Sequence, residues 1–527
     1  MARFVAVAVP VPHLDVLTYR VPDGIDVPRV GARVVVPVGP RLLTGCVTSA
    51  DGTDLPEDSG IRDVADVLDD EPYLPEPCLT LALWMAEYYA CAPGEAIAAA
   101  LPPLSTVESR RGVALTPAGM NLLAFEGIDG LDGVARAALR AIAGRRRVTL
   151  GGLASDLATA LNRSAPVPVH ALVARLARQG LVTEASILTG APSGHRRVRV
   201  AAVTPLGLAA LQCEERPRAL GPRQRLVLSA LRDARDGLTA DDLRQRQLPV
   251  DGLRRLEARG FVAISWQTRD RSPFSAPSAA HAALDDNGQR RELTAEQSRA
   301  LSQLGAMAAR GGFQVALVHG VTGSGKSEIY LRLAQQTVEA GRQVLVLVPE
   351  IGLTPALAGV FRATFGDRVA VQHSGLSDGE RHDQWHRIRR GDVDVVVGTR
   401  SAVFAPVTRL GVVVVDEEHD SSYKQDEAPR YHGRDLAIVR AKHAGATAVL
   451  GSATPSLESY QHARAGRYVL IELEQRVAAR PLADVRTVNM RQEYAQHGPD
   501  TVLSQALLAA VGARLERREQ VLLLLKT

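Results

Sequence analysis

The chain has 527 residues, too many for one hydrophobic core, so three or four domains are expected. Its composition, with 46% hydrophobic and 23% charged residues, is typical of a soluble globular protein. The four cysteines lie far apart without a CxxC pair, which argues against a zinc ribbon or a disulfide framework and fits a reducing cytoplasm. The first residues do not resemble a signal peptide, and no stretch reaches the roughly 18 apolar residues of a membrane span.

Charge is distributed unevenly along the chain, although the net charge is only +4. Residues 1–104 hold 6 Lys and Arg against 15 Asp and Glu, whereas residues 105–225 hold 17 against 8. The basic second segment suggests a surface that faces an anion. A solvated basic surface without a partner is an equal alternative.

Residues 1–104 are expected to form a small β-rich domain. Short runs of β type are separated by Pro and Gly, as in a small barrel or sheet: Phe4–Val9, Leu17–Val21, Gly31–Val38 and Gly45–Thr48. After an acidic loop, the spacing of apolar residues predicts a helix around Leu79–Tyr89. Trp84, Tyr88 and Tyr89 would lie on or near one face of this helix.

Residues 105–275 contain an internal repeat, in which Leu172–Val182 and Leu253–Val262 match at an offset of 80 residues. In both copies a helical pattern ends at a Gly in the position of a helix cap, and a β-like run follows. This order is typical of a winged helix, a fold that binds DNA or mediates protein contacts.

We predict a winged-helix domain over 105–215, a second winged-helix-like segment over 216–269 and a linker over 270–290. The wing of the first copy would be Leu181–Val203. Its arginines favour DNA over protein as the partner: Arg196, Arg197 and Arg199.

From residue 291 onward, strands of buried type alternate with helices. The predicted strands are Val315–His319, Val344–Val348, Val369–Gln372, Val393–Val397, Gly411–Val415, Thr447–Leu450 and Tyr468–Leu473. Helices are predicted around Lys326–Ala340, Pro355–Phe365, Gly379–Arg390, Gly433–His443 and Ser456–Ala465. Such alternation indicates a parallel sheet covered on both faces. The expected fold is therefore multidomain α/β, with one RecA-like lobe over 291–500.

A phosphate-binding loop follows the first of these strands. Gly320–Ser327 fits the pattern G-x-x-x-x-G-K-[ST] between a strand and a helix, which is the context that supports the motif. Lys326 would reach the β- and γ-phosphates of ATP, and Ser327 would hold Mg²⁺. The remaining predicted cofactor contacts in the loop are Gly320, Thr322, Gly323, Ser324 and Gly325.

An acidic motif, Asp416–His419, follows the apolar strand Gly411–Val415. Asp416 would fix Mg²⁺ beside Ser327, and Glu417 would orient and deprotonate the attacking water. A helix N-cap formed by Asp416 is the alternative, but it leaves Glu417, Glu418 and His419 unaccounted for. We predict that Glu418 and His419 contact the cofactor.

A third element, Gly451–Ser456, follows the strand Thr447–Leu450. Ser452 and Thr454 place hydroxyl groups at the strand end, where they could link the ATP site to bound nucleic acid. The order of the three motifs is that of superfamily 2 helicases.

Longer segments resemble the PriA family of bacterial primosomal replication-restart helicases. They are Val348–Pro355, Gly398–Pro406 and Asp416–Asp435 in the lobe, with Val9–Pro10, Thr18–Tyr19, Gly31–Gly39 and Trp84–Gly94 near the N-terminus. The resemblance implies an N-terminal domain that captures the 3′ end of a nascent strand, followed by a winged helix. It also implies an ATP- and Mg²⁺-dependent motor that remodels branched DNA with 3′→5′ polarity and starts primosome assembly.

The resemblance also assigns roles to single residues. An aromatic-rich loop that senses DNA would contain Tyr423, Lys424, Arg430, Tyr431 and His432, and the residue types suit stacking on unpaired bases. A loop that packs its own aromatic side chains is the alternative. Gln297 would read adenine, and Arg400 and Ser401 would touch the DNA backbone. The implied partners are forked and single-stranded DNA, primosome proteins, single-stranded-DNA-binding protein and the replicative helicase loader, at the nucleoid.

The PriA family continues with a second lobe that carries zinc-binding cysteines and an arginine finger, whereas residues 501–527 resemble only the entry into that lobe, a helix and an apolar strand. No cysteine follows Cys213, so no zinc site is expected in this chain. Because an arginine finger raises the rate roughly 10³–10⁵-fold, weak or no autonomous helicase activity is expected. The alternatives are a fork-binding scaffold without motor activity and another DEAH-like DNA translocase subunit.

Overall fold

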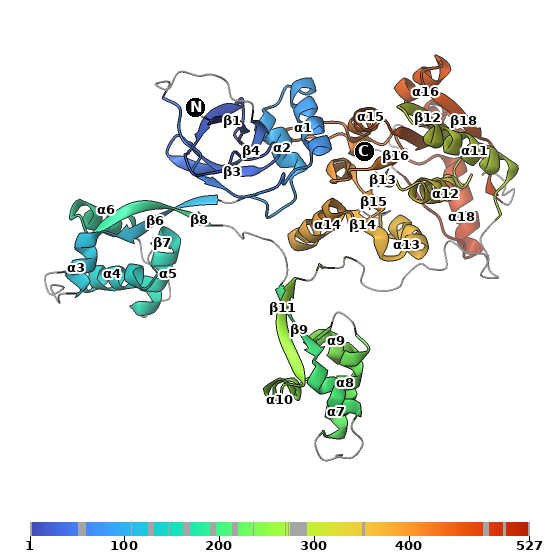
Figure 1. The fold of residues 1–527 in the computed structure, drawn as a ribbon. Helices are drawn as coiled ribbons and strands as arrows, with labels where there is room; N and C mark the ends of the chain where they lie inside the picture. Colours follow the sequence, from blue (N-terminus) through green and yellow to red (C-terminus); the bar gives the residue numbers. More distant parts are fainter. Residues whose placement is uncertain are drawn as a thin grey trace. The chain divides into compact units, whose positions relative to one another are not determined.

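The computed structural model describes residues 3–50, 60–106, 108–124, 131–145, 147–161, 169–189, 197–212, 220–234, 237–268, 270–271, 273, 292–349, 354–477, 484–498 and 502–524 (Figure 1). The chain divides into two compact parts, Met1–Gln475 and Arg476–Thr527. Among the residues described, no helix is long and apolar enough to cross a membrane.

The N-terminal domain is β-rich, as predicted. Its five-stranded antiparallel sheet has the order β2-β1-β4-β3-β5, built from β1 (Arg3–Ala8), β2 (Leu17–Val21), β3 (Arg33–Val38), β4 (Arg41–Ser49) and β5 (Asp66–Val67). Valines on one face form its core with Tyr19. Two helices follow, α1 (Glu76–Tyr88) and α2 (Pro93–Ala100). Gly94 lies so close to β1 that an added Cβ would be 1.7 Å from the carbonyl oxygen of Val9.

Two repeat units with the same order of elements come next. The first repeat unit consists of β6 (Glu108–Leu115), α3 (Pro117–Ala124), α4 (Gly133–Arg145), β7 (Arg147–Thr149), α5 (Leu150–Ala160), α6 (His170–Arg178) and β8 (Val182–Thr189). The second consists of β9 (Arg197–Val203), α7 (Pro205–Gln212), α8 (Pro222–Arg232), β10 (Leu238–Thr239), α9 (Ala240–Gln245), α10 (Leu253–Ala258) and β11 (Val262–Thr268). Their sheets have equivalent orders, β7-β6-β8 and β10-β9-β11.

The repeat therefore extends well beyond the segments that match in sequence. Thr116 donates a hydrogen bond to the carbonyl of Gly180 in the first unit, and Thr204 donates the same bond to Gly260 in the second. The predicted wing Leu181–Val203 is wrong, because its two strands do not pair with each other: β8 pairs with β6, and β9 pairs with β11. This pairing favours a boundary between the two units rather than at residue 215, and the winged-helix assignment itself stays a prediction.

The second half of the chain forms the predicted parallel sheet, of seven strands in the order β14-β15-β13-β16-β17-β12-β18. The strands are β12 (Gln314–Gly320), β13 (Gln343–Leu347), β14 (Val369–Gln372), β15 (Val395–Gly398), β16 (Leu410–Asp416), β17 (Thr447–Ser452) and β18 (Val469–Leu473). Parallel strands buried on both faces are apolar at every position, which is why their positions could be predicted closely.

Two hydrophobic clusters lie on opposite faces of this sheet, because neighbouring residues of a strand point to opposite sides. One face is covered by α11 (Ala295–Arg310), α12 (Lys326–Glu339) and α13 (Thr354–Phe365), the last followed by the 3₁₀ turn η5 (Gly366–Arg368). The other face contacts α14 (Asp378–Arg390), the 3₁₀ turn η6 (Arg400–Phe404), α15 (Gly433–Ala444) and α16 (Leu457–Arg464).

Helix α1 of the N-terminal domain belongs to this second face. Its buried residues Leu81 and Met85 lie in the same hydrophobic cluster as Phe404 and Tyr431 of the lobe. The Sγ atom of Cys78 lies 3.5 Å from the carbonyl oxygen of Phe404. The N-terminal domain and the lobe therefore share one core.

The predicted linker begins with two residues that are attached to the lobe. Asp270 pairs with Arg390 at 2.6 Å, and Arg271 pairs with the buried Asp383 at 2.9 Å, both on α14. Residues 274–291 lie outside the described residues.

The second compact part contains α17 (Met490–His497) and α18 (Gln505–Glu516). The apolar strand expected after α18 is not formed over 521–524, where Leu522 and Leu524 are each 97% exposed.

Candidate nucleotide-binding site

The phosphate-binding loop has the backbone geometry that the motif requires. It connects β12 to α12, and two of its glycines adopt left-handed conformations, Gly323 with φ +84° and Gly325 with φ +82°. Other residues adopt this region only at a cost, so glycine permits the turn that directs backbone N–H groups inward. Thr322, Gly323 and Ser327 are exposed at the mouth of the loop. The helix α12 that follows presents its positive N-terminal end to the same point.

Lys326 is buried inside this loop. Its Nζ atom donates a hydrogen bond to the carbonyl oxygen of Gly320 at 2.9 Å and lies 3.9 Å from the Glu417 carboxylate. The buried hydroxyl of Ser324 has no hydrogen-bond partner among the described residues. An ammonium group and an unpaired hydroxyl facing a glycine-rich turn fit the phosphates of a nucleotide, which would supply the missing partner.

Asp416, at the end of β16, fits a magnesium ligand. Its pKa is raised to about 6, because burial and the neighbouring Glu417 carboxylate, which raise it, outweigh Lys326 and the Tyr330 hydroxyl, which lower it. Tyr330 donates a hydrogen bond to Oδ1 of Asp416 at 3.2 Å. A buried carboxylate beside a second one lacks positive charge, which a divalent cation would provide. The described residues contain no cluster of three or more metal-ligating side chains, and Mg²⁺ commonly takes one or two protein ligands plus substrate phosphates.

Glu417 occupies a strained backbone position, with φ +44°. A non-glycine residue in this region costs about 1–3 kcal/mol and often marks a functional site. The turn sends the side chain of Glu417 toward Lys326 and that of the next residue the opposite way. A half-exposed carboxylate near the lysine can contact a water molecule at the phosphates, as its predicted role requires.

The acidic motif contacts the third predicted motif directly. Nδ1 of His419 lies 2.8 Å from the hydroxyl oxygen of Ser452, and its Nε2 lies 3.5 Å from that of Thr454. Ser452 is fully buried, whereas Thr454 is exposed. His419 thus connects the ends of β16 and β17, and its Nδ1 also lies 3.7 Å from the Glu417 carboxylate, so its contact with the cofactor stays a prediction.

Glu418 already has partners within the lobe, and its contact with the cofactor stays a prediction. The side chain is fully buried, pairs with Arg434 at 3.0 Å and accepts hydrogen bonds from Ser456 and Ser459 at the start of α16. Its role is to hold α15 and α16 together behind the site.

Gln297 lies next to the phosphate-binding loop, but both ends of its amide are already bonded. Its Nε2 donates to the carbonyl of Ser324 at 2.8 Å, and its Oε1 accepts from the backbone N–H of Thr294 at 2.9 Å. These contacts support the loop and cap α11. Contact with adenine stays a prediction.

The aromatic-rich loop packs its tyrosines inward, which is the alternative to base stacking. Tyr423, in the 3₁₀ turn η7 (Ser421–Tyr423), is fully buried and donates a hydrogen bond to the backbone carbonyl of Asp416 at 2.7 Å. Tyr431 is 2% exposed and packs edge-on against Phe404. Neither ring offers a face for a base in this structure, so stacking by these two tyrosines is corrected to packing.

The other predicted residues of this region are more accessible. Lys424, Arg430 and Ser401 are exposed, and His432 is half-buried. Arg400 donates hydrogen bonds to the carbonyls of Ser422 at 3.0 Å and Lys424 at 2.6 Å, so it holds the loop in place. DNA contact by any of them stays a prediction.

The structure also connects this loop to the N-terminal domain. The hydroxyl of Tyr89 accepts a hydrogen bond from the backbone N–H of His432 at 3.1 Å, and the ammonium of Lys424 lies 5.3 Å from the centre of the Tyr89 ring. Tyr89, Tyr330 and Arg434 were missed as site residues. Of these, Tyr330 could have been found, because it lies one helical turn after Lys326.

The predicted DNA-binding arginines of the first wing belong to the second repeat unit. Arg199 is exposed on β9, and Arg197 begins the same strand. Arg196 lies outside the described residues.

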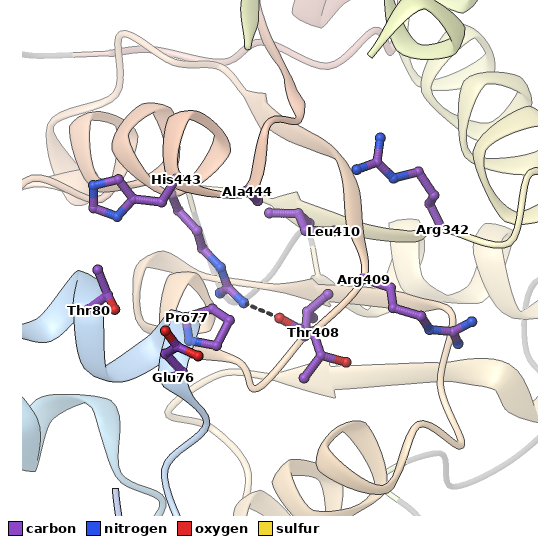
Figure 2. Close-up of a pocket in the computed structure, with 11 residues that line it drawn as sticks. Glu76, Pro77, Thr80, Arg342, Thr408, Arg409, Leu410, His443 and Ala444 are labelled. Carbon is purple, nitrogen blue, oxygen red and sulfur yellow. Dashed lines mark hydrogen bonds between the residues drawn. The ribbon is translucent and has the colours of Figure 1, made fainter. Parts of the chain in front are cut away.

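A cavity of about 500 Å³ lies at the opposite edge of the sheet (Figure 2). Glu76 and Thr80 of α1 line one side, and Arg342 and Arg409, which precede β13 and β16, line the other. Because parallel strands begin at this edge and end at the phosphate-binding loop, this cavity is not the nucleotide site.

Two family models match the chain: the 3′DNA-binding domain (3′BD) of PriA over residues 6–102, and the DEAD/DEAH box helicase over residues 294–463. Replication restart protein PriA of Bacillus subtilis (strain 168) is 33% identical over 516 residues, which cover 96% of this chain and 60% of that protein. Replication restart protein PriA of Chlamydia pneumoniae is 43% identical over 234 residues, which cover 44% of this chain and 31% of that protein.

A solved structure, that of a hypothetical ATP-dependent RNA helicase from Sulfolobus tokodaii, is 23% identical in sequence over 34% of this chain and 53% of that protein. Its TM-score of 0.26 is too low to inform on function. The chain spans about three fifths of the length of the relatives that it matches almost throughout.

Proposed function

Because the chain belongs to the PriA family of replication restart proteins, we propose that it binds branched DNA at stalled forks and couples this binding to Mg-ATP in its helicase lobe. The observation that carries the proposal is a continuous series of contacts from the N-terminal domain to the ATP site. Tyr89 bonds the loop at His432, and Tyr423 of the same loop bonds Asp416.

In this proposal Lys326 binds the β- and γ-phosphates, exchanging its hydrogen bond with Gly320 for bonds to phosphate oxygens. Ser327 and Asp416 hold Mg²⁺, which when bound neutralises charge on the phosphates. Glu417 orients the attacking water and accepts its proton. Lys326 and Glu417 approach within 3.9 Å, so both reach the same small volume.

The finer parts of the proposal follow the family. They are capture of a 3′ strand end by residues 6–102, unwinding with 3′→5′ polarity, and recruitment of primosome proteins, single-stranded-DNA-binding protein and the helicase loader. The proposal also includes the predicted absence of a zinc site in this chain and its predicted location at the nucleoid. Contacts to DNA through the exposed Lys424, Arg430, Ser401 and Thr454 are part of the same proposal.

Two measurements test it together. The affinity of the chain for a fork with a free 3′ end should exceed its affinity for blunt duplex of equal length, and ATP hydrolysis should rise when the fork is added. Lys326→Ala should abolish the rise in hydrolysis and leave fork affinity unchanged.

Fork binding without any hydrolysis in the wild type would favour a non-motor scaffold. Equal affinity for fork and duplex would favour another DEAH-like translocase and contradict the proposal. Strand separation measured in the same reactions decides whether autonomous helicase activity is weak, as expected from the sequence.

A further inference from the structure

The second repeat unit carries a two-stranded ribbon that projects beyond its own sheet. Strand β9 pairs with β11 along seven residues, from Arg197 opposite Thr268 to Val203 opposite Val262. The third strand, β10, pairs only with Val200 and Ala201. The ribbon formed by 197–199 and 266–268 therefore has no third strand beside it among the described residues.

An exposed tryptophan lies on this ribbon. Trp266 is 61% exposed, and its indole ring makes no hydrogen bond or ring contact with any described residue. The two other tryptophans of the chain are packed: Trp385 is 3% exposed, and Trp84 stacks on Tyr88 with ring centres 4.7 Å apart. A large aromatic side chain with its ring in solvent is available for a partner to pack against it.

The residue directly across the ribbon from Trp266 is Arg199. Opposite residues of an antiparallel pair point to the same face, so the indole and the guanidinium lie side by side, and both are exposed. An aromatic face beside an arginine is the combination that binds single-stranded nucleic acid, since the base stacks on the ring and the phosphate pairs with the guanidinium.

The equivalent position of the first repeat unit lacks this combination. There Arg111 stands opposite Ser186, in the register that Arg199 and Trp266 occupy in the second unit. An arginine thus occupies this position in both repeat units, whereas a tryptophan stands opposite it only in the second unit. Core packing does not explain why a tryptophan stands at this position in the second unit, because Trp266 is not part of the hydrophobic cluster of that unit.

The ribbon also ends close to the helicase lobe along the chain. Thr268, the last residue of β11, is two residues before Asp270, which is attached to Arg390 of α14. Two residues of extended chain span at most about 7 Å. A strand held on the ribbon would therefore be bound only a few residues along the chain from a point of attachment to the helicase lobe.

We propose that this ribbon binds an unpaired nucleotide of a DNA strand, with its base stacked on Trp266 and its phosphate paired with Arg199. The inference rests on the proposed function, because it takes DNA as the partner of the chain. It adds a defined contact that neither the N-terminal domain nor the helicase motifs supply.

Indole fluorescence of the full chain tests the proposal during titration with a short oligothymidylate. Stacking should quench the emission of Trp266 in the wild type, and the quenching should disappear in Trp266→Phe, which retains a stacking ring. Trp266→Ala should weaken affinity about 5- to 100-fold, the effect of losing one base–aromatic stack.

Arg199→Ala should also weaken the affinity for the oligothymidylate, and it should reduce the slope of log affinity against log salt concentration by about 1. Leu226→Ala is the control, because Leu226 is 58% exposed in the same repeat unit and lies outside the ribbon.

Unchanged quenching in Trp266→Phe, or affinity of Trp266→Ala within twofold of wild type, would overturn the inference while leaving the proposed function intact. Equal quenching of Trp266 by blunt duplex would overturn the claim that the base is unpaired. Absence of DNA binding by every protein, wild type included, would instead reject the proposed function on which the inference depends.

Discussion

Replacement of Asp416 by Asn should make the nucleotide-free chain more stable, although it removes a proposed magnesium ligand. The carboxylate is buried at the end of β16, and its pKa is raised from 3.8 to about 6. In the unfolded chain the group ionises near its ordinary pKa, so folding at neutral pH places a charge where it is disfavoured. Asparagine keeps the shape and an oxygen for the Tyr330 hydroxyl, and it carries no charge.

The size of the effect follows from the two pKa values. A raised pKa in the folded state means that stability is fully present below the unfolded pKa, near 4, and is lost as pH rises through 6. The two values differ by roughly 2 units, so the loss approaches about 3 kcal/mol at pH 8 and about half of that at pH 5. The free energy of unfolding of Asp416→Asn should therefore exceed that of the wild type by about 3 kcal/mol at pH 8 and by about half as much at pH 5.

Hydrogen exchange of peptides from β16 and β17 can measure this gain locally, since a chain with several domains has no single unfolding free energy. Asp392→Asn, at a half-exposed site after α14, is the matched control and should change protection in neither strand. Adding Mg-ATP should stabilise the wild type more than the variant, which keeps Lys326 and Ser327 but lacks one proposed magnesium ligand. Equal protection of wild type and variant at pH 8, or an advantage independent of pH, would refute the reasoning.

Three further substitutions separate binding from folding. Lys326→Ala should weaken Mg-nucleotide affinity at least about tenfold in a fluorescent-nucleotide titration, because one charge-assisted contact is lost, whereas the exposed Lys442→Ala should not. Glu418→Gln should destabilise the lobe by about 3 kcal/mol, because Arg434 loses its buried partner; normal thermal unfolding would contradict this. Gly94→Ala should destabilise the N-terminal domain by about 2–3 kcal/mol through the clash with Val9, whereas Gly133→Ala, with open space around it, should have no such cost.

Local patterns in the sequence located the elements well but could not identify their partners. The seven strands of the lobe were predicted to within two residues at each end, because each is a continuous apolar run between polar turns. The wing Leu181–Val203 failed for a different reason. Both of its strands exist, but β9 pairs with β11, whose paired residues lie 59 to 71 positions later in the chain, and that choice depends on the repeat as a whole.

The site shows the same limit at the scale of single residues. The motif places Glu417 and Glu418 next to each other, and the sequence predicts catalysis for Glu417 and a cofactor contact for Glu418. The left-handed turn at Glu417 separates them, so one reaches Lys326 and the other is buried against Arg434. Likewise, the tyrosines at 423 and 431 suit stacking and packing equally by type, and only their burial decides.

In the proposed function, the buried Tyr423 connects the aromatic-rich loop to the nucleotide site. Its hydroxyl bonds the backbone of Asp416, and Asp416 together with burial raises the pKa of Tyr423 well above its usual value. Tyr330 bonds the side chain of the same residue. Because Mg²⁺ would change the charge around Asp416, both tyrosine contacts change with it, and one leads through His432 to Tyr89 of the N-terminal domain. Coupling must run equally in both directions, so a DNA strand that shifts the loop has to alter the affinity for Mg-nucleotide.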